Sequence, residues 1–317
     1  MYDFLTTLSL YKGSRHTPIA HSSCLIAHIA QKQAQSLNST RSRLSLARRL
    51  VRALASRMLL PPNLRSPKDK TTMRALLIVA SLLLLSPLSG RTQTTPNTLT
   101  KTESAQGWHL LFDGKNTATW VSAKGPDVQI TGWEVKDGIL NVTDHGGEEG
   151  GNSGDIMTAR TYKNFELSVD FRITRGANSG IKYFVDPAKT GKSIGFEYQI
   201  LDDAVHPDAH AGKNGNRTEG SLYDLIPAPA GKLVHPVGDW NTARIIVRGA
   251  HIEHWLNGKK IIETERFTPE FRQIVAGSKF HSISGFGELS EGHILLQDHG
   301  FPVSFRNVKI RELPPTP

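Results

Sequence analysis

A carboxylate and an amide stand two residues apart in a run that otherwise has the composition of a buried β-strand. The run starts at Gly195, and its apolar side chains alternate with Glu197 and Gln199. Because successive side chains of a strand point to opposite faces, Glu197 and Gln199 share one face while the apolar residues face a core. A carboxylate held on a sheet in this way can serve as a general base or acid. The structural alternative is a solvated face on which the Glu has no chemical role.

A second carboxylate follows at Asp202. The spacing Glu197-x-Gln199-x-x-Asp202 resembles the Glu-x-Asp-x-x-Glu strand of laminarinase-like jelly-roll glycosidases. That resemblance implies a nucleophile at Glu197 and an acid/base at Asp202, with a bulge that returns the last residue to the reactive face. A regular strand places Asp203 on the face of Glu197 instead. Retaining hydrolysis needs two carboxyl groups about 5 to 5.5 Å apart, so this interpretation stays an alternative.

A metal site is another chemical possibility, because His206, Asp208 and His210 carry side chains that bind divalent cations. A divalent cation would suit a reaction that builds negative charge on an oxygen. The spacing of the three residues matches no standard helical pair of ligands, and Pro207 favours an ordinary surface loop. The sequence indicates no other cofactor.

The elements that must position these residues are short β-strands. Phe165–Ile173 alternates strictly, and Asn257-Gly258 between two alternating runs predicts a hairpin with a type I′ turn. Only Thr268–Val275 has helical signals, with Pro269 at the first position. Further strands are predicted at Gly132–Val135, Ile139–Val142, Ile181–Val185, Ala243–Val247, Ile294–Leu296 and Val303–Ile310. The pattern predicts an all-β fold, a two-sheet sandwich or jelly roll.

The residues before this region divide into three segments. Residues 1–72 are basic, and Met73–Gly90 has the short basic start, apolar middle and small-residue end of a signal peptide. Residues 91–106 are polar and Thr-rich, which predicts a flexible leader. Residues 1–72 are interpreted as an upstream translation artefact, with a transit peptide or a signal-anchor arrangement as the alternative. We expect a secreted or periplasmic protein.

The charge and the cysteine content limit the function classes. The net charge is +9, but residues 1–72 hold twelve Lys and Arg against Asp3 and Asp69, so the remainder is nearly neutral. The basic balance is therefore no evidence for a nucleic-acid partner. The apolar run after Met73 is shorter than the roughly 20 residues of a membrane span, which argues against stable membrane insertion of the mature protein. The single cysteine, Cys24, precedes the folded region, so no thiol chemistry is expected there.

Several ordered motifs resemble the 3-keto-disaccharide hydrolase family. They are Gly107–Lys115, Asn178–Phe184, Gly195–Asp203, Gly220–Leu225, Asp239–Asn241, His254–Gly258, Leu296–Gly300 and Phe305–Asn307. The resemblance covers 107–313 and implies a concanavalin A-like two-sheet fold and action on glycosides whose sugar carries a ketone at C3. Lys182 departs from the commoner family pattern, which places a bulky or aromatic residue there.

A ketone at C3 acidifies the hydrogen on C2, so one base can remove it and the C1 substituent can leave by elimination before water adds. This route needs a base, a partner for the enolate oxygen and an acid for the departing oxygen. We hypothesise that Glu197 is the base and His299 the proton donor or enolate partner. Further substrate contacts are expected from Asn178, Lys182, Gln199, Asp202, Tyr223, Gln297 and Arg306. The structural alternatives are a turn histidine for His299 and an ion-paired surface arginine for Arg306.

The sequence therefore predicts an enzyme that cleaves 3-keto-glycosides, by elimination and rehydration or by net hydrolysis. A carbohydrate is the expected substrate, and an oxidoreductase that installs the ketone is the expected functional partner. The alternatives are a non-catalytic carbohydrate-binding module, since one fold serves many functions, and a conventional retaining glycosidase.

Overall fold

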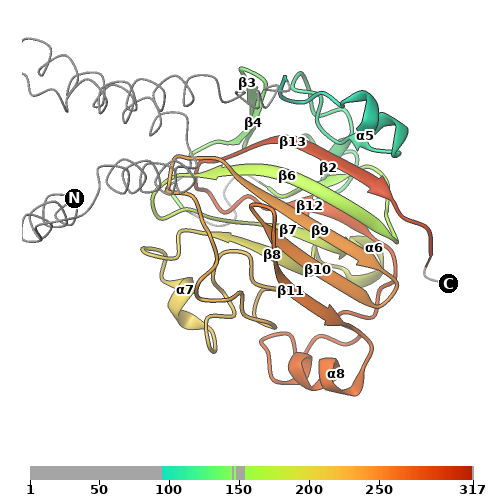
Figure 1. Ribbon diagram of the computed structural model, residues 1–317, viewed down its shortest axis with the longest axis vertical. Coiled ribbons are helices and arrows are strands. Elements are labelled where there is room, and N and C mark those ends of the chain that lie inside the picture. The colour runs from blue at the N-terminus through green and yellow to red at the C-terminus, as the bar shows by residue number, and fades with distance from the viewer. Residues whose placement is uncertain (1–94, 145, 148–153, 316–317) are drawn as a thin grey trace, which may run out of the picture. The chain divides into compact units, whose positions relative to one another are not determined.

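In the computed structural model, residues 95–144, 146–147 and 154–315 are described, and they form two antiparallel sheets with a few short helices (Figure 1). The predicted extension 1–72 and signal peptide 73–90 lie outside these residues, as do residues 91–94 of the predicted leader. Within the described part of the chain, no helix is long and apolar enough to cross a membrane.

The larger sheet has eight strands and the smaller has five. The order in the eight-stranded sheet is β11 (Lys259–Glu265), β10 (His251–Leu256), β9 (Asn241–Arg248), β6 (Phe165–Ile173), β13 (Val303–Glu312), β4 (Ile139–Val142) and β3 (Trp133–Lys136), and β1 (His109–Leu110) also pairs with β13. The order in the five-stranded sheet is β2 (Trp120–Ser122), β5 (Ile156–Thr158), β12 (His293–Leu296), β7 (Asn178–Val185) and β8 (Phe196–Leu201).

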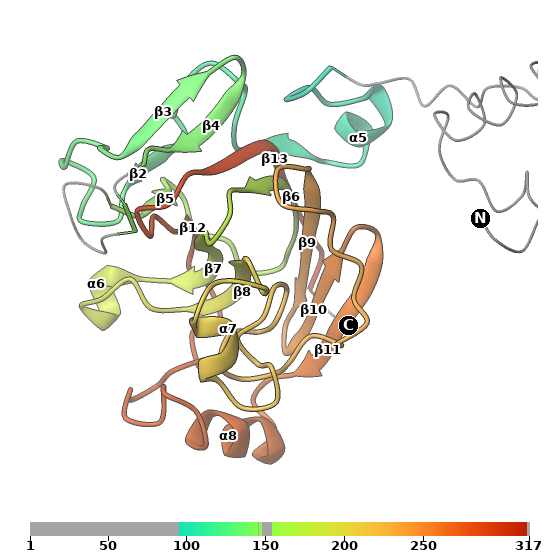
Figure 2. The same ribbon diagram turned by 90° about the vertical axis from the view of Figure 1, so that its left-hand side faces the viewer.

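Each sheet turns one face toward a shared core, and Figure 2 shows the two sheets from the side. Leu167, Val169 and Phe171 of β6 are fully buried in this core, as are Tyr198 and Ile200 of β8. Burying one such side chain stabilises the fold by about 1.5–3 kcal/mol. The strict alternation of Phe165–Ile173 thus corresponds to a strand with one face in the core, as predicted. The prediction of an all-β two-sheet sandwich is confirmed.

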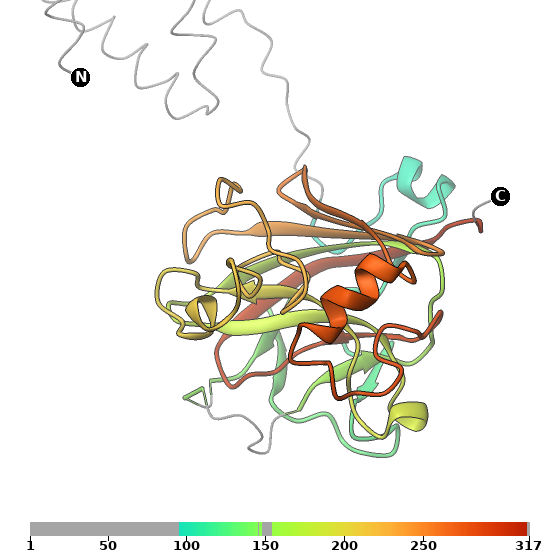
Figure 3. The ribbon, with the colours of Figure 1, turned by 90° about the horizontal axis from the view of Figure 1, so that it is seen from below.

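The predicted turn and helix are present. Asn257 and Gly258 join β10 to β11 with φ angles of 50° and 81°, the left-handed pair that a type I′ turn requires. Helix α8 (Pro269–Ala276) starts after Thr268, whose side chain accepts a hydrogen bond from the Phe271 amide. Helix α8 lies across one end of the sandwich (Figure 3). Two one-turn helices, α6 (Pro187–Thr190) and α7 (Asp208–Ala211), interrupt the loops on either side of β8.

The leader predicted at 91–106 is folded from Thr95 onward. Asn97 is buried, and its side chain and backbone exchange hydrogen bonds of 2.7 and 2.8 Å with Asn307 of β13. Helix α5 (Lys101–Ala105) follows, and Thr100 with Glu103 forms a capping box at its start. The prediction of a flexible leader was wrong for this part, because its stabilising partners lie 210 residues away.

Candidate active site

The face of the five-stranded sheet that points away from the core, hereafter the outer face, brings most of the predicted site residues together. In β7 and β8, Lys182 pairs with Glu197 and Gly180 pairs with Gln199. Their chain neighbours Ile181 and Tyr198 are in the core, so these paired residues point outward together. Asn178 lies two residues before Gly180 and therefore shares this face. The pairing of β12 with β7 places Gln297 opposite Gly180.

Gly180 leaves the room that the Glu197 carboxylate occupies. A β-carbon built on Gly180 would lie 2.5 Å from Glu197 Oε1 and 2.9 Å from Cδ. The Gln199 amide, oriented to satisfy both neighbours, donates to Glu197 Oε1 and to the Ser179 carbonyl, each at 3.1 Å. Glu197 is 7% exposed. The carboxylate is thus packed over β7 and held by one amide donor.

Two lysines face this buried carboxylate. Lys182 neighbours Glu197 across the strand pair, and its Nζ lies 3.6 Å from Asp155 Oδ2. Lys279 comes from the segment after α8. Burial raises the pKa of Glu197 above its ordinary value, and the positive charges of Lys182 and Lys279 only partly offset this rise. A carboxylate with a raised pKa is a stronger base once it is ionised, which is what removal of a carbon-bound proton requires.

The free edge of β8 is covered by the residues Gly220–Tyr223, here called the edge segment. Gly220 donates to the Gln199 carbonyl, and Tyr223 donates to the Glu197 carbonyl at 3.0 Å. Leu222 of this segment pairs with Tyr198 and is fully buried. Tyr223 is also buried, but its hydroxyl reaches the Asp208 carboxylate and the charge of Glu197 acts on it, which places Tyr223 beside Glu197. The predicted site residue Tyr223 therefore reaches the site through backbone pairing.

Behind Tyr223 lies a network of charged side chains. The Tyr223 hydroxyl donates to Asp208 Oδ2 at 2.7 Å. Arg217 donates to Asp208 Oδ1 at 2.8 Å and to Asp224 Oδ1 at 2.6 Å. The Lys279 backbone amide donates to Asp224 Oδ2 at 2.6 Å. This network fixes the edge segment to α7 and to the chain after α8.

The same contacts argue against the predicted metal site at His206, Asp208 and His210. Arg217 and Tyr223 occupy the Asp208 carboxylate, and His206 Nδ1 accepts from the Asp208 backbone amide at 3.2 Å. His210 is exposed at the end of α7. The three side chains therefore form no common ligand set, because the carboxylate is already bonded to protein donors.

Asp202 serves the backbone of the turn after β8. Its Oδ2 accepts from the Gly176 amide at 2.8 Å and its Oδ1 from the Ala204 amide at 3.1 Å. With both oxygens engaged, Asp202 supports a turn and is not aimed at a substrate. The second carboxylate that a laminarinase-like mechanism needs is therefore not supplied by Asp202.

Arg306 lies on the opposite side of the sandwich from Glu197. It pairs with Asp170 in the eight-stranded sheet, and its guanidinium stacks 4.0 Å from the Trp240 ring centre. Its neighbour Phe305 is in the core, so Arg306 points away from both the core and the five-stranded sheet. The prediction that Arg306 joins the site was wrong, because the sequence did not reveal which sheet this strand enters.

The chain after β12 returns to the outer face. The Gln297 amide donates to the Gly180 carbonyl at 2.9 Å, and Ser179 Oγ donates to the Gln297 carbonyl at 2.8 Å. The buried Gln297 Oε1 accepts no hydrogen bond from the described residues. His299 is half-buried two residues further on. Gln297 thus offers an amide at the sheet surface, and His299 lies in the adjoining turn.

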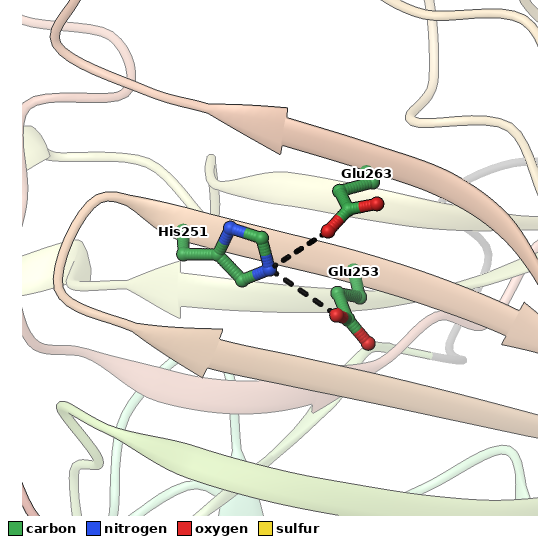
Figure 4. Close-up of side chains that lie close together, drawn as sticks. All are labelled: His251, Glu253 and Glu263. Carbon is green, nitrogen blue, oxygen red and sulfur yellow. Dashed lines mark hydrogen bonds and ion pairs between the residues drawn. The ribbon is translucent and has the colours of Figure 1, made fainter. Parts of the chain in front are cut away.

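A different group of side chains could hold a cation on the far side of the molecule. Figure 4 shows His251 and Glu253 on β10 turned toward Glu263 on β11. The possible ligand atoms of the three side chains lie within 4.8 Å of one another. Lys260 Nζ already lies 2.6 Å from Glu263 and 3.3 Å from Glu253. These residues belong to the eight-stranded sheet, and we interpret them as an ion-paired surface cluster.

A pocket of about 190 Å³ lies beside α8. Phe271 and Phe286 line it, and both rings also pack edge-on against Phe196. Phe196 is the core-facing neighbour of Glu197. The pocket therefore adjoins the start of β8 on its core side, and Glu197 is not among its lining residues.

Glu219, just before the edge segment, is a buried carboxyl that we predict to be neutral in the folded protein. It is fully buried, its Oε2 accepts from the Leu201 amide at 3.0 Å, and its Oε1 has no partner among the described residues. Burial raises its pKa well above the ordinary value. The folded state then binds a proton that the unfolded state loses, so stability falls as the pH rises above about 4.5.

We expect Glu219→Gln to raise the free energy of unfolding, and the gain to increase with pH by up to about 1.4 kcal/mol per unit until the folded-state pKa is passed. Urea unfolding at several pH values measures this. The exposed Glu134→Gln is the matched control and should show no such trend. Equal pH dependence in wild type and Glu219→Gln would contradict a neutral Glu219.

Comparison with known proteins assigns most of the described chain to a family. A family model described as a 3-keto-alpha-glucoside-1,2-lyase-like domain matches residues 107–311. The chain belongs to this family. The lyase-like domain spans all the strands of both sheets except the last residue of β13, and membership identifies the chain as a glycoside-cleaving enzyme.

The chain is similar to two named proteins, one of them a solved structure. The chain is 35% identical over 232 residues to a 3-keto-disaccharide hydrolase from Bacteroides thetaiotaomicron, covering 66% of this chain and 79% of that protein. It is 32% identical to a crystal structure of a "putative glycosyl hydrolase" from Parabacteroides distasonis, with a TM-score of 0.62, and the match covers 69% of this chain and all of that one. The predicted family resemblance is thus confirmed.

Sequence reasoning missed four residues around the candidate site. These residues come from three separate loops, Asp155 from one, Arg217 and Asp224 from a second and Lys279 from a third, and no local spacing links them to Glu197. The one available signal was the family motif Gly220–Leu225, which contains Asp224. Contacts between loops depend on the register of distant strands, which a single sequence does not reveal.

Proposed function

We propose that this chain cleaves glycosides whose sugar carries a ketone at C3, with Glu197 as the base that removes the C2 hydrogen. The observation that carries the proposal is a buried carboxylate on the outer face with two lysines facing it. Family membership and the relative named 3-keto-disaccharide hydrolase support the substrate class.

The reaction begins at Glu197. The ionised carboxylate takes the proton from C2, and the electron pair of that bond moves toward the C3 carbonyl to form an enolate. The enolate then expels the C1 substituent, and water adds to C1 to complete a net hydrolysis. Burial favours this step because a base in a water-poor site keeps its strength.

The enolate oxygen requires a positive or donating partner. The Lys182 ammonium is fixed beside Asp155 and next to Glu197, so it can stabilise negative charge that develops near the carboxylate. We assign it this role together with His299 in the turn after β12. A preorganised donor at a developing oxyanion typically contributes about 10²–10³-fold in rate.

Amide side chains supply the remaining contacts with the sugar. Asn178 lies on β7, Gln199 on the neighbouring strand β8, and Gln297 directly after β12 on the other side of β7. All three lie on the outer face. Amide groups both donate and accept hydrogen bonds, which suits hydroxyl groups on a sugar ring. We propose that these three residues orient the substrate over Glu197.

The test of the proposal is a paired assay of one glucoside and its 3-keto derivative. We expect turnover of the 3-keto compound alone, and in deuterium oxide we expect deuterium at C2 of the released sugar. Turnover of the plain glucoside at a similar rate would favour a conventional glycosidase. Binding of either compound without any product would favour a carbohydrate-binding module.

The proposed substrate has consequences for the enzyme's surroundings. A 3-keto sugar must be produced from an ordinary sugar by oxidation, so we propose an oxidoreductase as the functional partner. The signal-like Met73–Gly90 segment supports export to the periplasm or beyond. N-terminal sequencing of the exported protein tests this, and a mature end upstream of Met73 would contradict it.

A further inference from the structure

The proposed reaction requires an acid for the departing oxygen, and two lysines are near the base. These lysines, Lys182 and Lys279, differ in the side chains that contact their ammonium groups. Lys182 Nζ is paired with Asp155 at 3.6 Å. By contrast, no carboxylate among the described residues forms an ion pair with the Lys279 ammonium, which lies 4.1 Å from the centre of the Tyr223 ring.

Lys279 is held in place through its backbone. Its amide donates to Asp224, which Arg217 fixes from the other side. The residue as a whole is exposed, while its ammonium end lies against Tyr223, whose backbone is bonded to that of Glu197. The side chain therefore lies at the rim of the site, on an anchored backbone, with an ammonium group that a substrate can reach.

We propose that Lys279 is the proton donor to the leaving glycosidic oxygen, an assignment that rests on the proposed function. Tyr223 is a poorer candidate because its hydroxyl proton is donated to Asp208. Partial burial of the ammonium end lowers the pKa of Lys279, and Arg217 lowers it further. The carboxylates of Glu197, Asp208 and Asp224 only partly offset this effect. Lowering the pKa makes the ammonium a stronger acid.

The proton and electron changes balance in two steps. In the first, the Glu197 carboxylate takes the C2 proton, a C1–C2 double bond forms, the C1–O bond breaks, and Lys279 gives its proton to the leaving oxygen. In the second, the neutral Lys279 amine takes a proton from water as the water oxygen bonds to C1, and Glu197 returns its proton to C2. Both side chains then regain their starting charges.

The leaving group separates this role from a general electrostatic one. An alkoxide needs a proton to depart, whereas 4-nitrophenoxide is stable enough to leave without one. We expect Lys279→Met to slow cleavage of methyl 3-keto-glucoside by about 10²–10⁴-fold and cleavage of the 4-nitrophenyl analogue by less than tenfold. Lys279→Arg keeps the charge but is too weak an acid, so it should show the same selective loss.

The controls distinguish this inference from the proposed function. Lys192→Met removes an exposed charge before β8 and should leave both rates unchanged, and circular dichroism checks that each variant folds. Equal losses on both substrates, or recovery by Lys279→Arg, would overturn the role of Lys279 while leaving Glu197 as the base. If wild type cleaves neither 3-keto compound, the proposed function itself fails.

Discussion

Glu197→Gln should reduce turnover of a 3-keto-glucoside by about 10²–10⁴-fold, the contribution typical of a general base. The amide has the shape of the carboxylate but cannot take a proton. Because burial already raises the pKa of Glu197, removal of the charge should not reduce the stability of the fold. Initial rates with the 3-keto substrate, measured beside thermal unfolding, test both statements.

The pH dependence of the wild type gives an independent check of the same residue. The reaction needs ionised Glu197, so kcat/KM should fall as the pH falls through a pKa raised above the ordinary 4.5. The loss therefore begins at a higher pH than an exposed Glu would give. Glu134→Gln, an exposed substitution on β3, should leave rate and pH profile unchanged. Wild-type turnover by Glu197→Gln would remove Glu197 from the mechanism.

Gly180→Ala should reduce kcat by about 100-fold without unfolding the protein. The added methyl group would lie 2.5 Å from Glu197 Oε1, so the carboxylate must move. A displacement of about 1 Å in a reacting group costs on the order of 10²-fold. The backbone of Gly180 does not adopt a positive φ, so alanine at this position causes no backbone strain. The substitution should therefore act mainly by displacing the Glu197 carboxylate.

Gly231→Ala is the matched control, since a β-carbon there meets no atom within 4 Å. It should retain full activity. Steady-state kinetics of both variants, with unfolding curves, separate the two possible outcomes. An unchanged kcat in Gly180→Ala would mean that the position of the Glu197 carboxylate does not matter for the reaction.

The sequence predicted the alternation that places Glu197 and Gln199 on one face, because strand periodicity is local. It also led to Asn178, Lys182, Tyr223 and Gln297 through the family motifs. The structure brings these residues to the outer face through the register of β7, β8, β12 and the edge segment. That register depends on contacts between distant strands, which spacing alone does not determine.

The errors have the same origin. Arg306 has a residue type that suits sugar binding, but it lies in the eight-stranded sheet. Asp202 was predicted to contact the substrate from its spacing to Glu197, but both its oxygens accept hydrogen bonds from the backbone of the turn. The flexible leader was predicted from composition, and composition does not reveal that Asn97 bonds to Asn307, which is far away in the sequence. Lys279 was missed because its link to the site runs through Asp224, a contact between two loops.

The edge segment also bears on how the protein behaves at high concentration. An uncovered outermost strand is a template for strand addition by another chain, which leads to aggregation. Gly220–Tyr223 covers the outer edge of β8. In the eight-stranded sheet, the outermost strand β11 carries the exposed charged residues Lys259, Glu263 and Glu265. Trimming or loosening the Gly220–Tyr223 stretch should therefore promote fibril-like association as well as loss of activity.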